Sequence, residues 1–571
     1  MRSWNVRVVF VALLAIALTS AACARTDGPM LFNMVHHNPG EERWVTDFTE
    51  PHHLKKLGYT GQILAYGAQC GLTFDDFEEN VVSRHSTERA WIEHHAFECR
   101  KYFDKARKVD LSEYPWIDVL VVPKSLMAKY GDEMKGTDGK LSILKPMTER
   151  IVRAQLAEFF KLYPSIEGIT IRFGETYLHD TPFHVGGSPV HTPDEHARLM
   201  NILRDEVCVK RGKTVIYRLW DFAQFHTKPE LYLPAANQVE PHEKFLVAFK
   251  HCNFDFMRTY PMNANIGLGK HGQIIELSLN QGGCYGKNAY PYYLGKGLID
   301  GFRDDVEGPW RHGKRDIKGL KDIKDWPIIK GYWLWNWGDG WKGPYFSNEF
   351  WMRLNETVLR RWVLNQGIQD TGHGTEKRDE ESIFMEYAKG DLGLGEEDAA
   401  KFRKLCLLSE DAGYYGYHSD VGKIDDWWLR DNYFRAVKLD GFVKAGTLEA
   451  LYKEKRDNLA RWDEIVKLAD EIKFPNEEDG HFVRVSSRYG MYKHKIAEII
   501  IRAQGFLATH ETDKAKAASH VKEFEDTWSA WEKLRRENPD CPTLYEYESF
   551  EFNYSEPLFG RSLKKLKDMC K

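Results

Sequence analysis

The chain of 571 residues carries 80 basic and 85 acidic side chains and a formal net charge of −5, so it lacks the cationic excess that nucleic-acid binding requires. Hydrophobic residues make up 42% and charged residues 29%, which excludes a disordered or collagen-like chain. Aromatic residues reach 13%, with 18 Trp and 27 Tyr, and fit either an aromatic-rich core or a site that stacks sugars.

The first 24 residues have the pattern of a signal peptide. Two arginines precede an apolar run over residues 8–18, and small residues then end in Ala22-Cys23-Ala24. This run is too short to span a bilayer, and no later stretch is long and apolar enough for a transmembrane helix. We expect cleavage after Ala24 and an exported protein, periplasmic or extracellular. The segment 20–23 also resembles a lipoprotein box, which would anchor the chain to lipid through Cys23.

Between residues 26 and 370, short apolar runs alternate with amphipathic stretches such as Met147–Leu162 and Pro193–Val207. The apolar runs predict eight strands: Met30–Val35, Gln62–Tyr66, Trp116–Val122, Gly168–Phe173, Thr214–Leu219, Phe245–Phe249, Gln273–Leu279 and Ile328–Trp335. Eight such units over roughly 340 residues are typical of a (β/α)8 TIM barrel of the α/β class. An open doubly wound sheet would carry a glycine-rich phosphate turn after its first strand, and here His36-His37-Asn38-Pro39 follows instead.

After residue 376 the apolar residues recur at helical spacing. Thr447 is a candidate N-cap, and Pro475 and Pro539 are expected to end two helices. We therefore predict an all-helical C-terminal domain over residues 376–571, with its boundary at 372–375.

The cysteines of the predicted mature chain are scattered and include no C-x-x-C pair, so neither a zinc ribbon nor a redox motif is expected. Cys541 and Cys570 flank the last segment and could form a disulfide. No cofactor or metal is predicted.

In a barrel the reacting groups lie where the strands end. Ionisable residues occupy or follow the ends of strands four to seven: Glu175, Arg218, Lys250, Asp255 and Glu276. Carboxylates that face one another across a cavity suit glycoside hydrolysis, where one protonates the leaving oxygen and another activates water or attacks carbon. Any single buried carboxylate could equally be part of a structural salt bridge. The two cations either hold the carboxylates ionised or bind a negative charge on the substrate.

Strand eight has a tryptophan at every second position, Trp333, Trp335 and Trp337, so these side chains share one face of the strand. They could fill the barrel core or form a wall on which a sugar stacks. Trp335, Trp337, Asp339 after strand eight and His37 after strand one join the two cations as candidate substrate-binding residues. Because His36 and His37 are adjacent, they would point to opposite faces and do not make the His-x-His motif of metal-dependent barrel hydrolases.

These motifs, taken in order, resemble the α-glucuronidases of glycoside hydrolase family 67. That family has a glutamate just after strand four, as Glu175 is here. Its strand-six motif runs from a lysine to an aspartate and a phenylalanine, matching Lys250, Asp255 and Phe256. Glu276-Leu277 and Asn280-Gln281 are similar to its strand-seven motif. The family carries a β-rich domain before its barrel, whereas here the predicted mature chain begins almost at strand one, as in a distant relative.

The resemblance implies a barrel followed by a helical domain, and an inverting mechanism. Glu175 would be the acid, Asp255 and Glu276 would position and deprotonate water, and Arg218 and Lys250 would bind the uronate carboxylate. We therefore expect an exported glycoside hydrolase that removes a terminal, α-linked uronic acid from an oligo- or polysaccharide. Two alternatives stay open: a retaining glycosidase acting on a neutral sugar, and a non-catalytic carbohydrate-binding protein on the same fold.

Overall fold

The computed structural model describes most of the chain after the predicted signal peptide. The described residues are 28–35, 46–64, 67–173, 178, 180–220, 225–253, 256, 261–279, 289–302, 317–337, 348–366, 379–424, 429, 434, 436–541 and 559–571. The signal peptide and the predicted domain boundary at 372–375 therefore lie outside the described residues.

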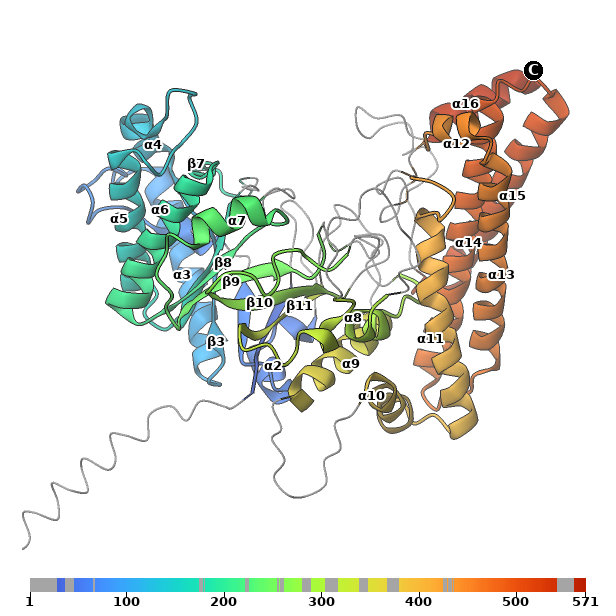
Figure 1. Ribbon diagram of the computed structural model, residues 1–571, viewed down its shortest axis with the longest axis horizontal. Helices are drawn as coiled ribbons and strands as arrows, with labels where there is room; N and C mark the ends of the chain where they lie inside the picture. The colour runs from blue at the N-terminus through green and yellow to red at the C-terminus, as the bar shows by residue number, and fades with distance from the viewer. Residues whose placement is uncertain are drawn as a thin grey trace, which may run out of the picture.

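A parallel sheet that curls into a barrel forms the first part of the molecule (Figure 1). Its strands, in spatial order, are β3 (Ser112–Glu113), β2 (Gly61–Leu64), β1 (Met30–Val35), β11 (Ile329–Trp337), β10 (Gly272–Ser278), β9 (Phe245–Lys250), β8 (Thr214–Arg218), β6 (Gly168–Arg172) and β4 (Trp116–Asp118). Every neighbouring pair within this sheet is parallel. The (β/α)8 prediction is confirmed, since parallel strands of this number joined by helices make that architecture.

The two outer strands of the sheet, β3 and β4, are consecutive in the chain and close the ring. Only Tyr114 and Pro115 separate them, and Pro115 has no amide hydrogen for the ladder. The backbone N–H of Tyr114 donates to the Gln62 carbonyl on the β2 side (2.9 Å). On the other side the N–H of Thr170 in β6 donates to the Pro115 carbonyl (2.9 Å). Together β3 and β4 thus act as the third of eight barrel strands.

The predicted third strand, Trp116–Val122, is wrong in its second half. The chain leaves the barrel after Asp118, because Leu120 adopts a left-handed backbone (φ 67°) that an extended strand cannot contain. Residues Val121–Pro123 then form β5, which pairs antiparallel with β7 (His184–Gly186). This small second sheet comes from the segments that follow strands three and four.

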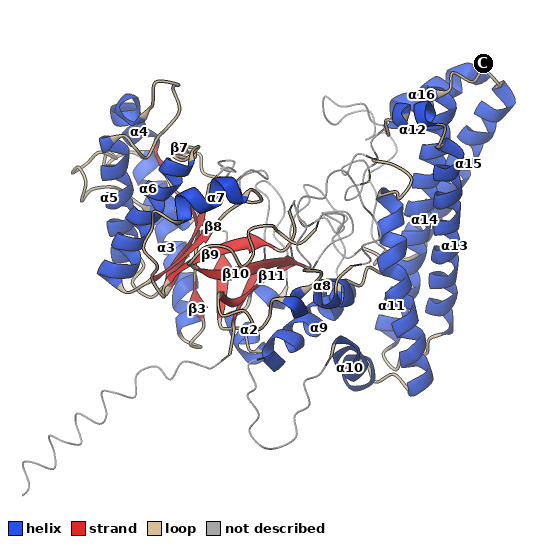
Figure 2. Cartoon of the chain, in the orientation of Figure 1, coloured by secondary structure: helices blue, strands red, loops and turns tan. Residues whose placement is uncertain are grey.

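Helices flank the barrel strands on the outside (Figure 2). They are α2 (Pro51–Leu57), α3 (Thr87–Arg107), α4 (Lys124–Tyr130), α5 (Pro146–Leu162), α6 (Pro193–Leu203), α7 (Pro229–Ala236), α8 (Gly295–Asp300) and α9 (Phe350–Gln366). Proline opens α2, α5, α6 and α7, where its missing N–H costs nothing and its fixed φ suits the first turn. The helix predicted over Pro193–Val207 continues past α6 as a π-turn over Arg204–Val209.

The C-terminal region is helical, as predicted, and contains no strand among its described residues. Its helices are α10 (Glu380–Glu386), α11 (Glu396–Tyr417), α12 (Asp440–Ala445), α13 (Leu448–Glu471), α14 (Glu477–Ala508), α15 (Lys514–Glu537) and α16 (Phe559–Cys570). Pro475 and Pro539 follow α13 and α15, as expected. Thr447 does precede α13, but its side chain makes no capping hydrogen bond, so that detail of the prediction is wrong. Among the described residues no helix is both long and apolar enough to cross a bilayer.

Cys541 and Cys570, whose pairing the sequence left open, do not form a disulfide. Cys541 is buried as a thiol, and the Cys570 thiol donates to the Leu566 carbonyl within its own helix (3.1 Å). The helix α16 is therefore held by apolar packing instead: Phe559, Leu563 and Leu566 are all buried.

The helical region packs against the barrel through the segment that precedes α8 and through α9. Tyr290 contacts the Trp462 ring of α13 (5.6 Å between centroids), and the backbone N–H of Tyr293 donates to Ser409 of α11 (3.0 Å). The Trp351 indole of α9 donates to Ser486 of α14 (3.0 Å). These contacts are buried and join the two parts into one continuous apolar core.

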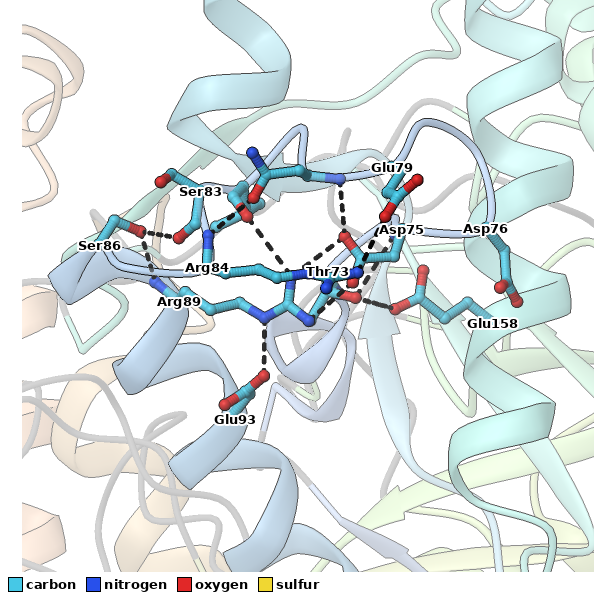
Figure 3. A network of polar contacts seen from close by, with 12 residues as sticks. Thr73, Asp75, Asp76, Glu79, Ser83, Arg84, Ser86, Arg89, Glu93 and Glu158 are labelled. Carbon is cyan, nitrogen blue, oxygen red and sulfur yellow. Dashed lines mark hydrogen bonds and ion pairs between the residues drawn. The ribbon is translucent and has the colours of Figure 1, made fainter.

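The segment between β2 and α3 is tied down by ion pairs and hydrogen bonds, which Figure 3 shows from close by. Arg89 of α3 donates to both carboxylate oxygens of Asp75 (3.0 and 2.7 Å) and to Glu93 (2.7 Å). The backbone and hydroxyl of Thr73 both donate to Glu158 of α5 (2.7 and 3.0 Å). These bonds fix one of the loops that leave the C-terminal ends of the barrel strands.

Candidate active site

The C-terminal ends of six barrel strands direct polar or aromatic side chains into the barrel. Each of these residues lies two positions after a side chain on the inner face, so it shares that face. They are Asp118 on β4, Arg172 on β6, Arg218 on β8, Lys250 on β9, Glu276 on β10 and Trp335 on β11. Below them the interior is apolar and includes Phe32, Ile216, Leu246, Ile274 and Trp333. The charged residues therefore form a layer at the mouth of the barrel, above a closed floor.

Arg218 and Glu276 form a buried ion pair across this mouth. The guanidinium Nε lies 3.1 and 2.9 Å from the two carboxylate oxygens of Glu276, and Nη2 lies 2.8 Å from Oε1. The two side chains are 2% and 0% exposed. Their strands are not neighbours, because β9 lies between them; Ala248 is in register with Arg218 on that strand, and its small side chain leaves room. Of the two roles left open for Arg218, these contacts show the pairing with a carboxylate.

A second ion pair, between Asp118 and Arg172, lies at the same level of the barrel. The two residues are cross-strand partners on β4 and β6, and the guanidinium binds the carboxylate with Nε on one oxygen and Nη2 on the other (2.5 Å for Nη2). Neither residue was among the predicted site residues. The signal was present, since an aspartate within the apolar run from Trp116 to Val122 is as costly to bury as Glu276 is in its strand.

Three tryptophans lie beside these charges. Trp116 lies edge-on to Trp333 and Trp335, with ring centroids 5.7 and 5.9 Å apart. The Arg218 guanidinium lies 4.8 Å from the Trp116 centroid and 5.5 Å from that of Trp335, within range of a cation–π contact. Trp333 is fully buried, so of the two roles considered for the strand-eight tryptophans it fills the barrel core. Trp335 lies one layer higher and retains 4% exposure.

Lys250 completes the charged layer. It is in register with Glu276 on the neighbouring strand, and its ammonium lies 3.5 Å from the Trp220 ring centroid and 4.4 Å from that of Phe256. The next residue, His251, donates its backbone N–H to the Glu276 carbonyl (2.9 Å). Burial lowers the pKa of the His251 imidazole to about 4, so this ring is neutral at physiological pH and adds no charge beside Lys250.

The remaining predicted site residues lie outside the described part of the chain. These are His37, Glu175, Asp255 and Asp339, together with Asn280 and Gln281 of the strand-seven motif. The backbone of Trp337 ends β11, but its side chain is not described. Of the predicted set, the structure therefore brings Arg218, Lys250, Glu276 and Trp335 together. Among the described residues, no group of three or more His, Cys, Asp or Glu side chains is placed to hold a metal ion.

A cavity of about 920 Å³ lies elsewhere, between the outer side of the barrel and the helical region. It is lined by α2 and α9 on the barrel side, including His53 and Arg353, and by Tyr387 and Asp479 on the helical side. None of the residues in the charged layer lines it. We therefore place the candidate active site at the barrel mouth, where the charges converge, and not in this cavity.

No family model matches the chain, and no curated protein matches its sequence. One solved structure, described as a GH138 enzyme targeting pectin rhamnogalacturonan II, aligns with 97% of this chain and 69% of its own at 11% identity, with a TM-score of 0.58. The chain thus shares its fold with this enzyme. An O-GlcNAc hydrolase from Thermobaculum terrenum (9% identity, 95% and 94% coverage, TM-score 0.38) also aligns. So does a GH20 β-N-acetylhexosaminidase from Streptomyces coelicolor A3(2) (15%, 67% and 68%, TM-score 0.29).

Proposed function

We propose that this protein is a glycoside hydrolase that removes a terminal, α-linked uronic acid from an oligo- or polysaccharide. The observation that carries the proposal is the orientation of Arg218 in the charged layer at the barrel mouth. This guanidinium uses Nε and Nη2 for Glu276, and in the described part of the chain its Nη1 donates to no protein group. A buried cation is stabilised by hydrogen bonds that complete its donor set, and a substrate carboxylate would accept from Nη1.

The neighbouring groups fit the same role for Arg218. Glu276 orients the guanidinium, and Nη1 would bind the uronate together with the point charge of Lys250 on the adjacent strand. Glu175 is proposed as the general acid, and Asp255 as the residue that activates water with Glu276 in an inverting reaction. The resemblance to the α-glucuronidases supports these last roles.

A matched pair of aryl glycosides tests the substrate class: a uronide and the hexoside that differs only at C6. Lys250→Ala should lose on the order of 2–4 kcal/mol of transition-state stabilisation on the uronide and much less on the hexoside. Lys330→Ala is the control, because this exposed lysine lies at the opposite end of a barrel strand. Equal losses on both substrates, or a wild type that prefers the hexoside, would remove uronate recognition. Binding without turnover would instead support a carbohydrate-binding protein.

The stereochemistry is tested independently. Proton NMR of the first-formed sugar should show inversion, and Glu175→Gln should reduce turnover far more for natural sugar leaving groups than for activated aryl groups, because good leaving groups need little protonation. Retention would favour a nucleophilic carboxylate, and equal losses would give Glu175 another role.

We also propose export, on the pattern of the first 24 residues. N-terminal sequencing of the protein from its native host should begin at Arg25, or show a lipid-modified Cys23. An intact N-terminal methionine would contradict both.

A further inference from the structure

Two buried arginines at the barrel mouth share one indole ring. The Cζ of Arg172 lies 5.0 Å from the ring centroid of Trp116, and the Cζ of Arg218 lies 4.8 Å from it. The two guanidinium carbons are therefore within about 10 Å of each other, a distance comparable to the Debye length in physiological salt. Screening between them is weak, because both side chains are buried. Two like charges so close to one ring repel each other unless each is neutralised.

Each arginine has a carboxylate of its own, bound in the same way. Arg172 presents Nε and Nη2 to Asp118, and Arg218 presents Nε and Nη2 to Glu276. The side-on geometry fixes the plane of each guanidinium against the indole. If one carboxylate lost its charge, its arginine would remain a buried cation beside the other pair. That cation would then compete for the other carboxylate and for the ring.

We propose that Asp118 is a positioning residue for the reaction. By neutralising Arg172, Asp118 prevents this cation from displacing Arg218 from Trp116 and Glu276. Arg218 then keeps the orientation in which Nη1 is left for the substrate. Asp118 itself acts through Arg172 and need not touch the sugar. The inference rests on the proposed function, in which Arg218 holds the carboxylate of a uronide.

Three variants assayed on the uronide and its matched hexoside test this role. Asp118→Asn should lower kcat/KM on the uronide by about 10- to 100-fold, with a much smaller loss on the hexoside. Arg172→Met should lose activity on the uronide as well, because the unpaired, buried Asp118 carboxylate would draw Arg218 away from Glu276. Asp118→Asn combined with Arg172→Met removes both charges and should recover kcat/KM on the uronide to within about tenfold of the wild type. Asp132→Asn, at a fully exposed carboxylate, is the control and should match the wild type.

The recovery of activity when Arg172→Met is added to Asp118→Asn distinguishes a positioning role of Asp118 from a merely structural one. If the double variant loses as much activity as Asp118→Asn alone, or if both substrates lose equally, Asp118 does not act through this cation and the proposal is wrong. A loss above about 100-fold in the double variant would also overturn it, since Arg172 would then contact the substrate directly. Should Asp118→Asn fail to fold, the double variant decides: activity within about tenfold of the wild type supports the proposal, and an inactive double variant refutes it.

A second measurement does not depend on turnover. If the two ion pairs are coupled through Trp116, each arginine can partly use the other carboxylate when its own is neutralised. Combining Asp118→Asn with Glu276→Gln removes both carboxylates. The melting temperature of the double variant should therefore fall by more than the sum of the falls in the two single variants. Additive losses would refute the coupling. A wild type that cleaves no glycoside but shows this non-additivity would refute the proposed function alone.

Discussion

Neutralising Glu276 should destabilise the barrel through the arginine that it leaves behind. In Glu276→Gln the amide oxygen can still accept one hydrogen bond from Arg218, but the guanidinium, 2% exposed, loses the carboxylate charge. Removing one partner of a buried ion pair costs about 3–5 kcal/mol. Three indole rings 4.8, 5.5 and 5.8 Å from Cζ contact the guanidinium in the wild type and remain in the variant, so these cation–π contacts cancel in the comparison. We therefore expect the free energy of unfolding to fall by about 3–5 kcal/mol, toward the lower end because the amide still accepts one hydrogen bond.

Urea unfolding at neutral pH, followed by tryptophan fluorescence, measures this loss as a lower midpoint at an unchanged slope. Glu79→Gln is the matched control: this carboxylate is 79% exposed and pairs with Arg84 on the surface, so its loss should stay below about 1 kcal/mol. Replacing both members of the buried pair, as Arg218→Met with Glu276→Leu, should recover most of the stability, because apolar side chains of similar volume leave no unpaired charge. A loss below about 1 kcal/mol in Glu276→Gln, or a double variant no more stable than the single, would refute this reasoning.

Three further substitutions have expected outcomes. A Cβ at Gly413 would collide with the Tyr292 ring, so Gly413→Ala should cost about 1–3 kcal/mol in urea unfolding, whereas Gly441→Ala, with no atom within 4 Å, should cost almost nothing. Hydrogen bonds from its arginine partner lower the pKa of Asp75, and the stability that this carboxylate supplies is lost as pH falls through the lowered value; the melting-temperature gap between Asp75→Asn and wild type should therefore shrink below about pH 4. Burial lowers the pKa of His184 to about 4, so wild-type stability should fall as pH drops from about 6.5 to 4, and His184→Leu should flatten that part of the melting profile.

Much of the architecture follows from the local pattern of the sequence. Buried parallel strands are continuous apolar runs, and the run Met30–Val35 coincides with β1 at both ends. The same rule extended strand three too far, because the apolar run continues past Asp118 into residues that have left the barrel. The left-handed backbone at Leu120 separates β4 from β5, and β5 pairs with β7, which lies far along the chain.

For the candidate site, too, some features follow from the local sequence and others only from the tertiary structure. The two-residue period of a strand and the end at which the side chains lie are local properties, so the sequence by itself determined that Arg218, Lys250 and Glu276 face the barrel mouth. Only the tertiary structure decided which charges pair. Arg218 reaches past β9 to Glu276 because Ala248 leaves room, and Asp118 meets Arg172 because the third strand ends beside the fourth. Such pairings depend on the register of strands far apart in the chain and on the volumes of the side chains between them, and no local pattern records either.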